Sequence, residues 1–460
     1  MKPASVLNIL WTLFRMESSV PTYRTSFTGA CGKVAAMIFF IVATCLFLAC
    51  THDEDKSSAE IPDANLANSR TVMVYMVGEN SLGDPELKQD VREMIKGRNG
   101  LNFHAGDHLV LYVDDNALPR IYELKKSLSA SLLTDLTPVY TYKEDVNSAS
   151  ADQLGHFIRY VKRHYPAESY GLLMWSHASG WIPSTYAGDK TSGSSAKRRS
   201  FGLDNQKNSY INIGFQMEIK DMAAAIEAEG GVDFMFFDAC SMQTIEVAYA
   251  LRNATECIIA SPAEIPGPGA DYSTMVPAMF QKEDPVQQML SAYYNAYLYN
   301  RLYGVVISAV KTEALEDFAT EMRGIVQRYK SQLMDLDKQP LLNYFVYGTW
   351  GTVSPDCLDM QAVMQAVLPE NEYGPWKEKL DAFVSCQATD YWYSACVPDG
   401  FGGYGGVVYV IPSQCSGISM AIPFEVYSKN AARYDVSYLA TAWAQAVWNA
   451  VADGESGNLK

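Results

Sequence analysis

The sequence predicts an α/β fold in which a mostly parallel sheet is covered by helices on both faces. Two observations carry this prediction: strand-length runs that are almost wholly apolar, and amphipathic segments of helical spacing that alternate with them. Strands buried on both faces read as continuous apolar runs, and alternation of strand and helix is typical of parallel sheets. Reactive side chains of such folds are expected at the carboxyl ends of the strands.

The first strand–helix unit begins near Thr71. Residues 71–77 form an apolar run, Gly78-Glu79-Asn80-Ser81 ends it, and apolar residues then recur at helical spacing up to Ile95. The same order repeats along the chain to about residue 333. We expect further strands at 109–113, 171–175, 232–237, 256–261 and 304–310, and helices at 151–164, 215–228, 242–251, 285–299 and 315–333.

The pattern changes beyond about residue 335, where aromatic and glycine-rich segments such as 401–406 replace the alternation. We expect a carboxyl-terminal α+β extension over 335–460, after a main domain over 70–334. Residues 51–69 are polar and read as a flexible tether, and residues 1–50 as an amino-terminal extension with a signal peptide.

The apolar segment 34–49 leads into Phe47-Leu48-Ala49-Cys50, which resembles the processing site of a bacterial lipoprotein and makes Cys50 the expected lipidation site. A transmembrane anchor is the alternative, but a span needs about 20 apolar residues. The acidic run over 51–56 resembles an export signal of surface lipoproteins. We therefore expect an outer-membrane lipoprotein, either periplasmic or exposed at the surface.

Charge and cysteine content narrow the function. The formal net charge is -16 and the pI about 4.9, so the chain lacks the basic surface that binding to nucleic acid requires, and a cationic partner fits better. The cysteines beyond Cys50 match no zinc or redox spacing. Cys386 and Cys396 could form a disulfide, and buried unpaired thiols are the alternative.

Two apolar runs lead straight into reactive side chains, one into His177 and the other into Cys240. In a parallel sheet both would emerge at one edge, and a histidine beside a thiol favours the nucleophilic thiolate. We also expect Cys240 to begin the helix over 242–251, whose amino terminus would favour the thiolate further. Each residue also has a structural explanation, as a buried cysteine or as a histidine that caps a turn.

Four motifs together resemble the clostripain family of cysteine peptidases. They are Tyr75-Met76-Val77-Gly78-Glu79-Asn80, Trp175-Ser176-His177 with Gly180-Trp181, Asp238-Ala239-Cys240, and the helix over 245–251. The resemblance implies a caspase-like three-layer α/β/α sandwich and an endopeptidase that prefers Arg or Lys before the cleaved bond. Ala178 and Ser179 stand where relatives usually carry glycine, which affects the shape of the oxyanion region.

The resemblance also implies roles for single residues. Cys240 would be the nucleophile and His177 its base, and backbone N–H groups of Cys240 and of a residue among Ala178, Ser179 and Gly180 would hold the oxyanion. Asp238 would lie in the pocket for the basic side chain, unless it caps a helix. Glu264 either lines the same pocket or is a solvated loop acid.

Relatives in this family often cut themselves between the histidine and the cysteine. An exposed basic loop lies there, and its candidate cleavage positions are Lys190, Lys197, Arg198 and Arg199. The alternative is an ordinary charged loop. We expect no required cofactor and no defined metal site; calcium stays open, although no EF-hand spacing occurs.

Two other functions compete with a peptidase. One is a catalytically inactive surface lipoprotein of the same fold that binds peptide or glycan, suggested by the altered residues after His177 and the aromatic residues of 391–409. The other is an amidase or transpeptidase with the same cysteine and histidine. A serine hydrolase is disfavoured because no Gly-x-Ser-x-Gly follows a strand. The expected substrates are proteins or peptides with exposed Arg or Lys.

Overall fold

The computed structural model describes residues 66–182, 200–205, 214–300, 302–337, 340–346, 356–398, 404–423 and 438–449. All of them belong to one compact unit, Ala64–Lys460. The segment 34–49, Cys50 and the basic positions from Lys190 to Arg199 lie outside the described residues. Within the described ranges, no helix has the length and apolar character needed to cross a membrane.

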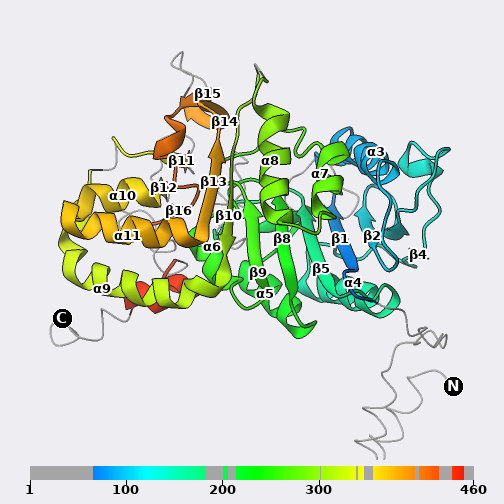
Figure 1. Ribbon diagram of the computed structural model, residues 1–460, viewed down its shortest axis with the longest axis horizontal. Coiled ribbons are helices and arrows are strands. Elements are labelled where there is room, and N and C mark those ends of the chain that lie inside the picture. The colour runs from blue at the N-terminus through cyan, green and yellow to red at the C-terminus, as the bar shows by residue number, and fades with distance from the viewer. Residues whose placement is uncertain are drawn as a thin grey trace, which may run out of the picture. The chain divides into compact units, whose positions relative to one another are not determined.

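A sheet of nine strands forms the centre of this unit, in the order β13-β10-β9-β8-β5-β1-β2-β3-β4 (Figure 1). Its five inner strands, from β9 to β2, are parallel to one another, and the outer pairs are antiparallel. The strands are β1 Arg70–Val77, β2 His108–Asp114, β3 Arg120–Glu123, β4 Tyr140–Thr141, β5 Ser169–Trp175, β8 Val232–Asp238, β9 Thr255–Ala260, β10 Val306–Lys311 and β13 Val384–Ala388.

Alternate side chains of the inner strands enter two separate cores. From β1, Tyr75 joins the core that includes α4, α5, α6 and α9, and Val74 joins the core of α3, α7 and α8. The predicted three-layer α/β/α sandwich with a mostly parallel sheet is therefore confirmed. The helices are α3 Glu86–Asn99, α4 Ala151–His164, α5 Ile219–Ala228, α6 Ile245–Ala250, α7 Tyr272–Met279, α8 Pro285–Tyr297 and α9 Leu315–Met334.

Several elements differ from the sequence prediction. Residues expected to start a helix form β7 (Phe215–Met217), which pairs with β6 (Phe201–Asp204), and the helix α5 starts only at Ile219. Phe215 is exposed, so it could not have belonged to a buried helical face. The strand β10 runs antiparallel to β9, since two consecutive helices, α7 and α8, return the chain to the end of the sheet at which β9 finished.

The carboxyl-terminal region contributes to the main sheet as well as adding elements of its own. Its strand β13 pairs with β10 at the sheet edge, and its short sheet and hairpin lie beyond that edge (Figure 1). Side chains such as Trp376 and Trp443 join the core beneath α9. The remaining elements are β11 Asn343–Val346, β12 Asp356–Asp359, α10 Met360–Val367, α11 Glu370–Phe383, β14 Tyr391–Pro398, β15 Tyr404–Tyr409, β16 Ser419–Met420 and α14 Ala442–Ala444, followed by a π-helical turn, Gln445–Asn449. The predicted domain boundaries stay predictions.

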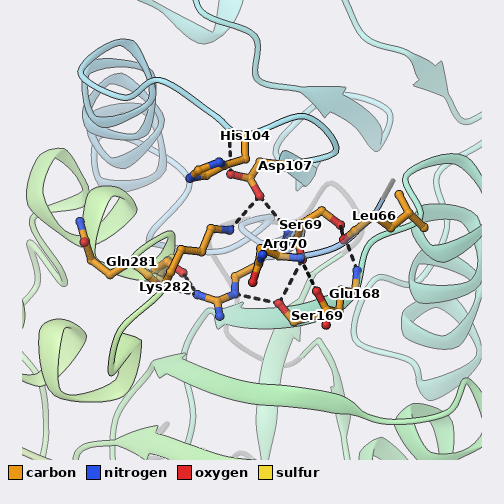
Figure 2. A network of polar contacts seen from close by, with 11 residues as sticks. Leu66, Ser69, Arg70, His104, Asp107, Glu168, Ser169, Gln281 and Lys282 are labelled. Carbon is orange, nitrogen blue, oxygen red and sulfur yellow. Dashed lines mark hydrogen bonds and ion pairs between the residues drawn. The ribbon is translucent and has the colours of Figure 1, made fainter. Parts of the chain in front are cut away.

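A polar network fixes the amino-terminal edge of the sheet (Figure 2). The Arg70 guanidinium donates to Ser169 Oγ at 3.0 Å and to the carbonyls of Met279 and Gln281 at 2.8 Å each. The backbone N–H of Arg70 donates to Asp107 Oδ1 at 2.8 Å. One arginine thus connects β1 to β5 and to the end of α7.

The cysteines of the carboxyl-terminal region favour unpaired thiols over a disulfide. Cys386 and Cys415 carry free thiols, and burial raises the pKa of both. The side chain of Cys396 lies outside the described residues. Cys386 therefore agrees with the alternative of unpaired thiols.

Candidate active site

The two predicted catalytic residues follow neighbouring strands of the sheet. The strands β5 and β8 are parallel, and Trp175 is the register partner of Asp238. His177 and Cys240 each stand two residues further along the chain, so both leave the sheet at the same carboxyl edge. Both side chains are half-buried. The topology therefore brings together a thiol and an imidazole, as the sequence predicts.

A third strand end supplies a residue that sequence reasoning missed. Ser81, in the turn after β1, places its Oγ 2.8 Å from Nε2 of His177. The side chain of Asn80 holds this turn by donating to the carbonyls of Val77 at 2.9 Å and Leu203 at 2.8 Å. The only sequence signal for a role of Ser81 is its position, because it follows an apolar strand whose carboxyl end lies at the edge where reactive side chains are expected.

The segment after His177 is held by β6. The N–H of Gly202 donates to the His177 carbonyl at 2.9 Å, and the N–H of Ser179 donates to the Ser200 carbonyl at 3.2 Å. Ala178 lies between them, in an antiparallel bridge with Phe201. Since the Ser179 N–H is already used, Ala178 and Gly180 are the residues of this segment that can supply an oxyanion donor.

The loops after His177 and after Cys240 touch. Gly180 has φ +66°, and a Cβ added there would lie 2.7 Å from the carbonyl oxygen of Ser241. Ser241 itself adopts φ +58°, a conformation that costs a non-glycine residue about 1–3 kcal/mol. Its N–H donates to the Ala263 carbonyl at 2.9 Å, which holds the strained turn in place.

The predicted helix start at Cys240 was wrong. The helix α6 begins at Ile245, and Thr244 caps it by accepting from the N–H of Val247. Because the left-handed turn at Ser241 interrupts the chain first, Cys240 lies outside the first turn of the helix, where a helix dipole acts. The helix amino terminus therefore does not explain a thiolate at Cys240.

Asp238 is buried, with 3% of its surface exposed. Its Oδ2 accepts from the hydroxyl of Tyr272 at 2.5 Å and from the N–H of Ala270 at 3.0 Å, while Oδ1 has no hydrogen-bond partner among the described residues. Burial raises the pKa of Asp238 to about 6, against the lowering effect of Tyr272 and Ala270. Asp238 does not cap α6, since Thr244 does.

A second buried acid lies behind Asp238. The indole N–H of Trp175 donates to Asp90 Oδ2 at 2.6 Å, and burial together with the charge of Asp238 raises the pKa of Asp90. Two neighbouring buried carboxylates do not both ionise readily, so a charge on Asp238 favours a protonated Asp90. The arrangement leaves one carboxylate available near Cys240.

Aromatic residues and a glycine shape the surroundings of Asp238. A Cβ at Gly269, whose φ is +62°, would lie 2.6 Å from Asp238 Oδ2, and the hydroxyl of Tyr297 donates to the Gly269 carbonyl at 2.5 Å. Burial raises the pKa of Tyr293 well above its usual value, and the charges of Asp238 and Cys240 add to the effect. Tyr293 is therefore close enough to both the acid and the thiol for their charges to affect it.

Glu264 contacts the carboxyl-terminal hairpin. The hydroxyl of Ser394, which is buried on β14, donates to Glu264 Oε2. Glu264 is half-buried, so it is a tethered acid and not a freely solvated one. Two hollows lie away from this edge: one of about 840 Å³ runs between α4 and α5, and one of about 1130 Å³ lies at the amino ends of the strands.

The carboxyl-terminal segment around Ser419 supports the loop after Cys240. Ser419 forms a bridge with Thr244, and its N–H donates to the Gln243 carbonyl at 3.1 Å. The N–H of Ala421 donates to Glu246 Oε1 at 2.9 Å. Residues of the extension thus support the loop after Cys240, a contact that the sequence pattern alone could not indicate.

Comparison with known proteins decides the family. The model of Peptidase C11, the clostripain family, matches residues 74–388 and so includes β5, β8 and both strand ends. The chain belongs to the clostripain family. Clostripain of Hathewaya histolytica is 27% identical over 223 residues, which make up 44% of this chain and 40% of that protein. This match thus spans less than half the length of that relative.

Solved structures of this family share the fold over most of the chain. A secreted C11 cysteine protease from Bacteroides thetaiotaomicron, in complex with an irreversible peptide inhibitor, is 29% identical with a TM-score of 0.67, over 83% of this chain and 99% of the other. An inactive zymogen C11 protease from Parabacteroides distasonis is also 29% identical, with a TM-score of 0.66, over 82% and 98% of the two chains.

Proposed function

We propose that this member of the clostripain family is a cysteine endopeptidase that cleaves peptide bonds after Arg or Lys, with Cys240 as the nucleophile and His177 as its base. The observation that carries the proposal is the placement of His177, Cys240 and Asp238 at the carboxyl ends of two register-paired strands. A thiol, a proton acceptor and a buried carboxylate are the groups that this reaction needs.

The reaction proceeds in two stages. His177 takes the thiol proton, the Cys240 thiolate attacks the carbonyl carbon, and the C–N bond breaks as His177 returns the proton to the leaving amine. Water, deprotonated by His177, then attacks the thioester and releases the acid and the thiol. Ser81 occupies Nε2 of His177, so proton transfer falls to Nδ1.

The oxyanion of each tetrahedral intermediate is held by backbone N–H groups. We assign one donor to Cys240 and the other to Ala178 or Gly180, because the Ser179 N–H donates to Ser200. A single oxyanion donor contributes about 3–4 kcal/mol to lowering the barrier in comparable enzymes. Alanine supplies a backbone N–H as well as glycine does, so Ala178 is compatible with catalysis.

Specificity for a basic residue follows from Asp238. Its Oδ1 has no partner among the described residues, and a guanidinium or ammonium group that reached it would complete a charge-assisted hydrogen bond. Arg can bind a carboxylate through two parallel bonds and Lys through one. Glu264, tethered to Ser394, is the second acid that we assign to substrate binding.

Two further steps precede activity in our proposal. The chain is cut after one of Lys190, Lys197, Arg198 or Arg199, between His177 and Cys240; the description of the Parabacteroides distasonis relative as an inactive zymogen supports this order. The chain is also carried to the outer membrane by a lipid on Cys50. Growth with an alkyne-tagged fatty acid would test the anchor: the wild-type chain should be labelled and bound to the membrane, whereas Cys50→Ala should be unlabelled and released.

Hydrolysis of fluorogenic peptides that end in Arg, Lys, Ala or Asp tests the proposed activity, with Cys240→Ala as the matched control. We expect the wild-type protein alone to cleave, and only after Arg or Lys. Tight binding of basic peptides that remain uncut would favour the inactive binding protein instead. Cleavage of a non-peptide amide, with peptides left intact, would favour an amidase or transpeptidase.

A further inference from the structure

The hydroxyl of Tyr293 is buried without a hydrogen-bond partner among the described residues. Tyr293 belongs to α8 and is 1% exposed, so bulk water does not reach its hydroxyl. Two neighbouring buried tyrosines do have a partner. Tyr272 donates to Asp238, and Tyr297 donates to the Gly269 carbonyl. Because an unpaired polar group away from water is unfavourable, the free hydroxyl of Tyr293 indicates a site that a ligand completes.

The ring of Tyr293 lies in the layer that covers Asp238. It meets the ring of Phe236 edge-on, with the two centroids 6.0 Å apart. Phe236 stands two residues before Asp238 on β8, and alternate residues of a strand face the same side of the sheet. The rings of Tyr293 and Tyr297 also touch, with centroids 5.7 Å apart. Tyr297 holds Gly269, the residue that approaches Asp238 Oδ2 most closely in the loop above it.

The electrostatics agree with this position. The charges of Asp238 and Cys240 both act on Tyr293, and burial raises its pKa well above the usual value. The hydroxyl therefore stays protonated, and a protonated phenol can accept a hydrogen bond as well as donate one. Tyr293 thus adds a neutral acceptor to a site whose other free atom is charged.

Asp238 by itself satisfies only part of a bound guanidinium. Its Oδ2 already accepts from Tyr272 and Ala270, so Oδ1 is the oxygen with free capacity. A guanidinium carries more N–H donors than an ammonium, and they point in fixed directions within one plane. Each donor left unpaired in a buried site weakens binding. A second acceptor beside Oδ1 therefore benefits Arg more than Lys.

We propose that the Tyr293 hydroxyl accepts a hydrogen bond from the guanidinium of an arginine substrate that is bound at Asp238, and so favours Arg over Lys before the cleaved bond. The inference rests on the proposed function and deepens it. Asp238 supplies the charge that both basic side chains need, and Tyr293 supplies the acceptor that separates them. Tyr293 is a specificity residue and takes no part in bond cleavage.

Binding to a chain that cannot cut tests the assignment. The full chain carrying Cys240→Ala is titrated in a calorimeter with two peptide amides that differ only in a final Arg or Lys. We expect the Arg peptide to bind about tenfold more tightly than the Lys peptide. Adding Tyr293→Phe, which removes the hydroxyl alone, should weaken binding of the Arg peptide about tenfold and of the Lys peptide less than about threefold.

Tyr249→Phe is the matched control. Tyr249 is also a buried tyrosine on a helix, and its hydroxyl donates to Glu316 Oε2 at 3.0 Å. Its removal breaks an existing hydrogen bond, so the melting temperature should fall while the Arg to Lys ratio stays the same. Tyr293→Phe breaks no hydrogen bond among the described residues, so its melting temperature should not fall. A purely structural role of Tyr293 would not change the ratio.

Binding and hydrolysis together separate the possible failures. Equal weakening of the two peptides by Tyr293→Phe, or no weakening of either, would overturn the assignment, as would failure of both peptides to bind the Cys240→Ala chain. Cleavage after Arg and Lys with the same ratio of kcat/KM in Tyr293→Phe and wild type would refute Tyr293 and leave the peptidase intact. A wild type that cuts neither peptide, but binds Arg more weakly once Tyr293 is replaced, would refute the peptidase and support the arginine site.

Discussion

Ser81 Oγ lies 2.8 Å from Nε2 of His177, although the two residues come from different strand ends and are 96 positions apart in the chain. The contact fixes which nitrogen of the imidazole faces the turn after β1 and which is left for the substrate. In the proposed reaction, a hydrogen bond of this kind orients the imidazole without touching the reacting atoms. Ser81 is therefore a positioning residue.

Replacing Ser81 by alanine should lower kcat/KM about tenfold, because one hydrogen bond to a group that becomes charged contributes about 1.5–3 kcal/mol and Ser81 is exposed. The loss should fall on kcat, with KM nearly unchanged, since Ser81 does not bind the substrate. Ser81→Thr, which keeps the hydroxyl, should restore most of the rate. Equal kcat in the alanine variant and the wild type would show that His177 is held by other groups.

The state of Asp238 predicts how cleavage depends on pH. Burial raises the pKa of Asp238 to about 6, so the carboxylate is charged at pH 7 and neutral at pH 5. The kcat/KM for an Arg peptide should fall as the pH drops through about 6. Asp238→Asn should lower this kcat/KM about 100-fold or more and abolish the titration near pH 6, because removing one charge of a buried pair costs about 2–5 kcal/mol. If kcat/KM still changes near pH 6 in the asparagine variant, the pH dependence belongs to another group.

The same pKa also predicts a change in stability. Since the folded-state pKa of Asp238 lies above its unfolded value of about 4, the folded protein binds the proton more tightly. The contribution of Asp238 to the free energy of unfolding is therefore present at pH 4 and lost as the pH rises to about 6. Urea unfolding of the Cys240→Ala protein, with and without Asp238→Asn, would measure this difference; a pH dependence that is identical in both would contradict it.

Arg70 offers a test of the fold that is independent of the active site. Arg70→Ala removes three side-chain hydrogen bonds at the amino edge of the sheet, and we expect a loss of about 2–3 kcal/mol in the free energy of unfolding. Arg92→Ala, at an exposed position on α3, should change it by less than about 0.5 kcal/mol. Denaturant titration gives both values, and equal stability of the two variants would refute the role of Arg70.

Gly180 should not tolerate a side chain. Its φ of +66° and the approach to Ser241 predict that Gly180→Ala lowers the free energy of unfolding by about 1–3 kcal/mol and reduces kcat, since the contact between the two catalytic loops must open. Gly324→Ala is the matched control: it lies within α9, meets only the end of the Arg328 side chain at 3.5 Å, and should stabilise the protein by about 0.5–1 kcal/mol. Two variants with the same melting temperature would contradict this reading of Gly180.

The inner strands were predictable from sequence because each is buried on both faces and reads as an unbroken apolar run. The positions of His177 and Cys240 at one edge of the sheet were predictable for the same reason, since they follow two such runs directly. Short or half-exposed elements carry no comparable signal: β4 has two residues, and Phe215 of β7 is exposed. The helix α6 was predicted to begin too early, because periodicity does not reveal the left-handed turn at Ser241.

The remaining parts of the site depend on contacts between distant segments. Ser81 reaches His177, and Ser394 reaches Glu264, each across a long stretch of chain. A single sequence contains no record of such contacts, because each residue on its own is an ordinary polar residue at a strand end, in a strand or in a turn. Asp238 is the exception, since it stands two positions before Cys240 and its proposed role comes from a motif.

The most direct test of the central claim is covalent labelling by a peptide chloromethyl ketone that ends in Lys or Arg, followed by peptide mapping in a mass spectrometer. We predict a single adduct on Cys240 that is absent in Cys240→Ala, slower to form in Ser81→Ala, and weak for the same reagent ending in Ala. An adduct on another cysteine, or labelling that is indifferent to the basic residue, would contradict the assignment of Cys240 as nucleophile and of Asp238 as the specificity acid.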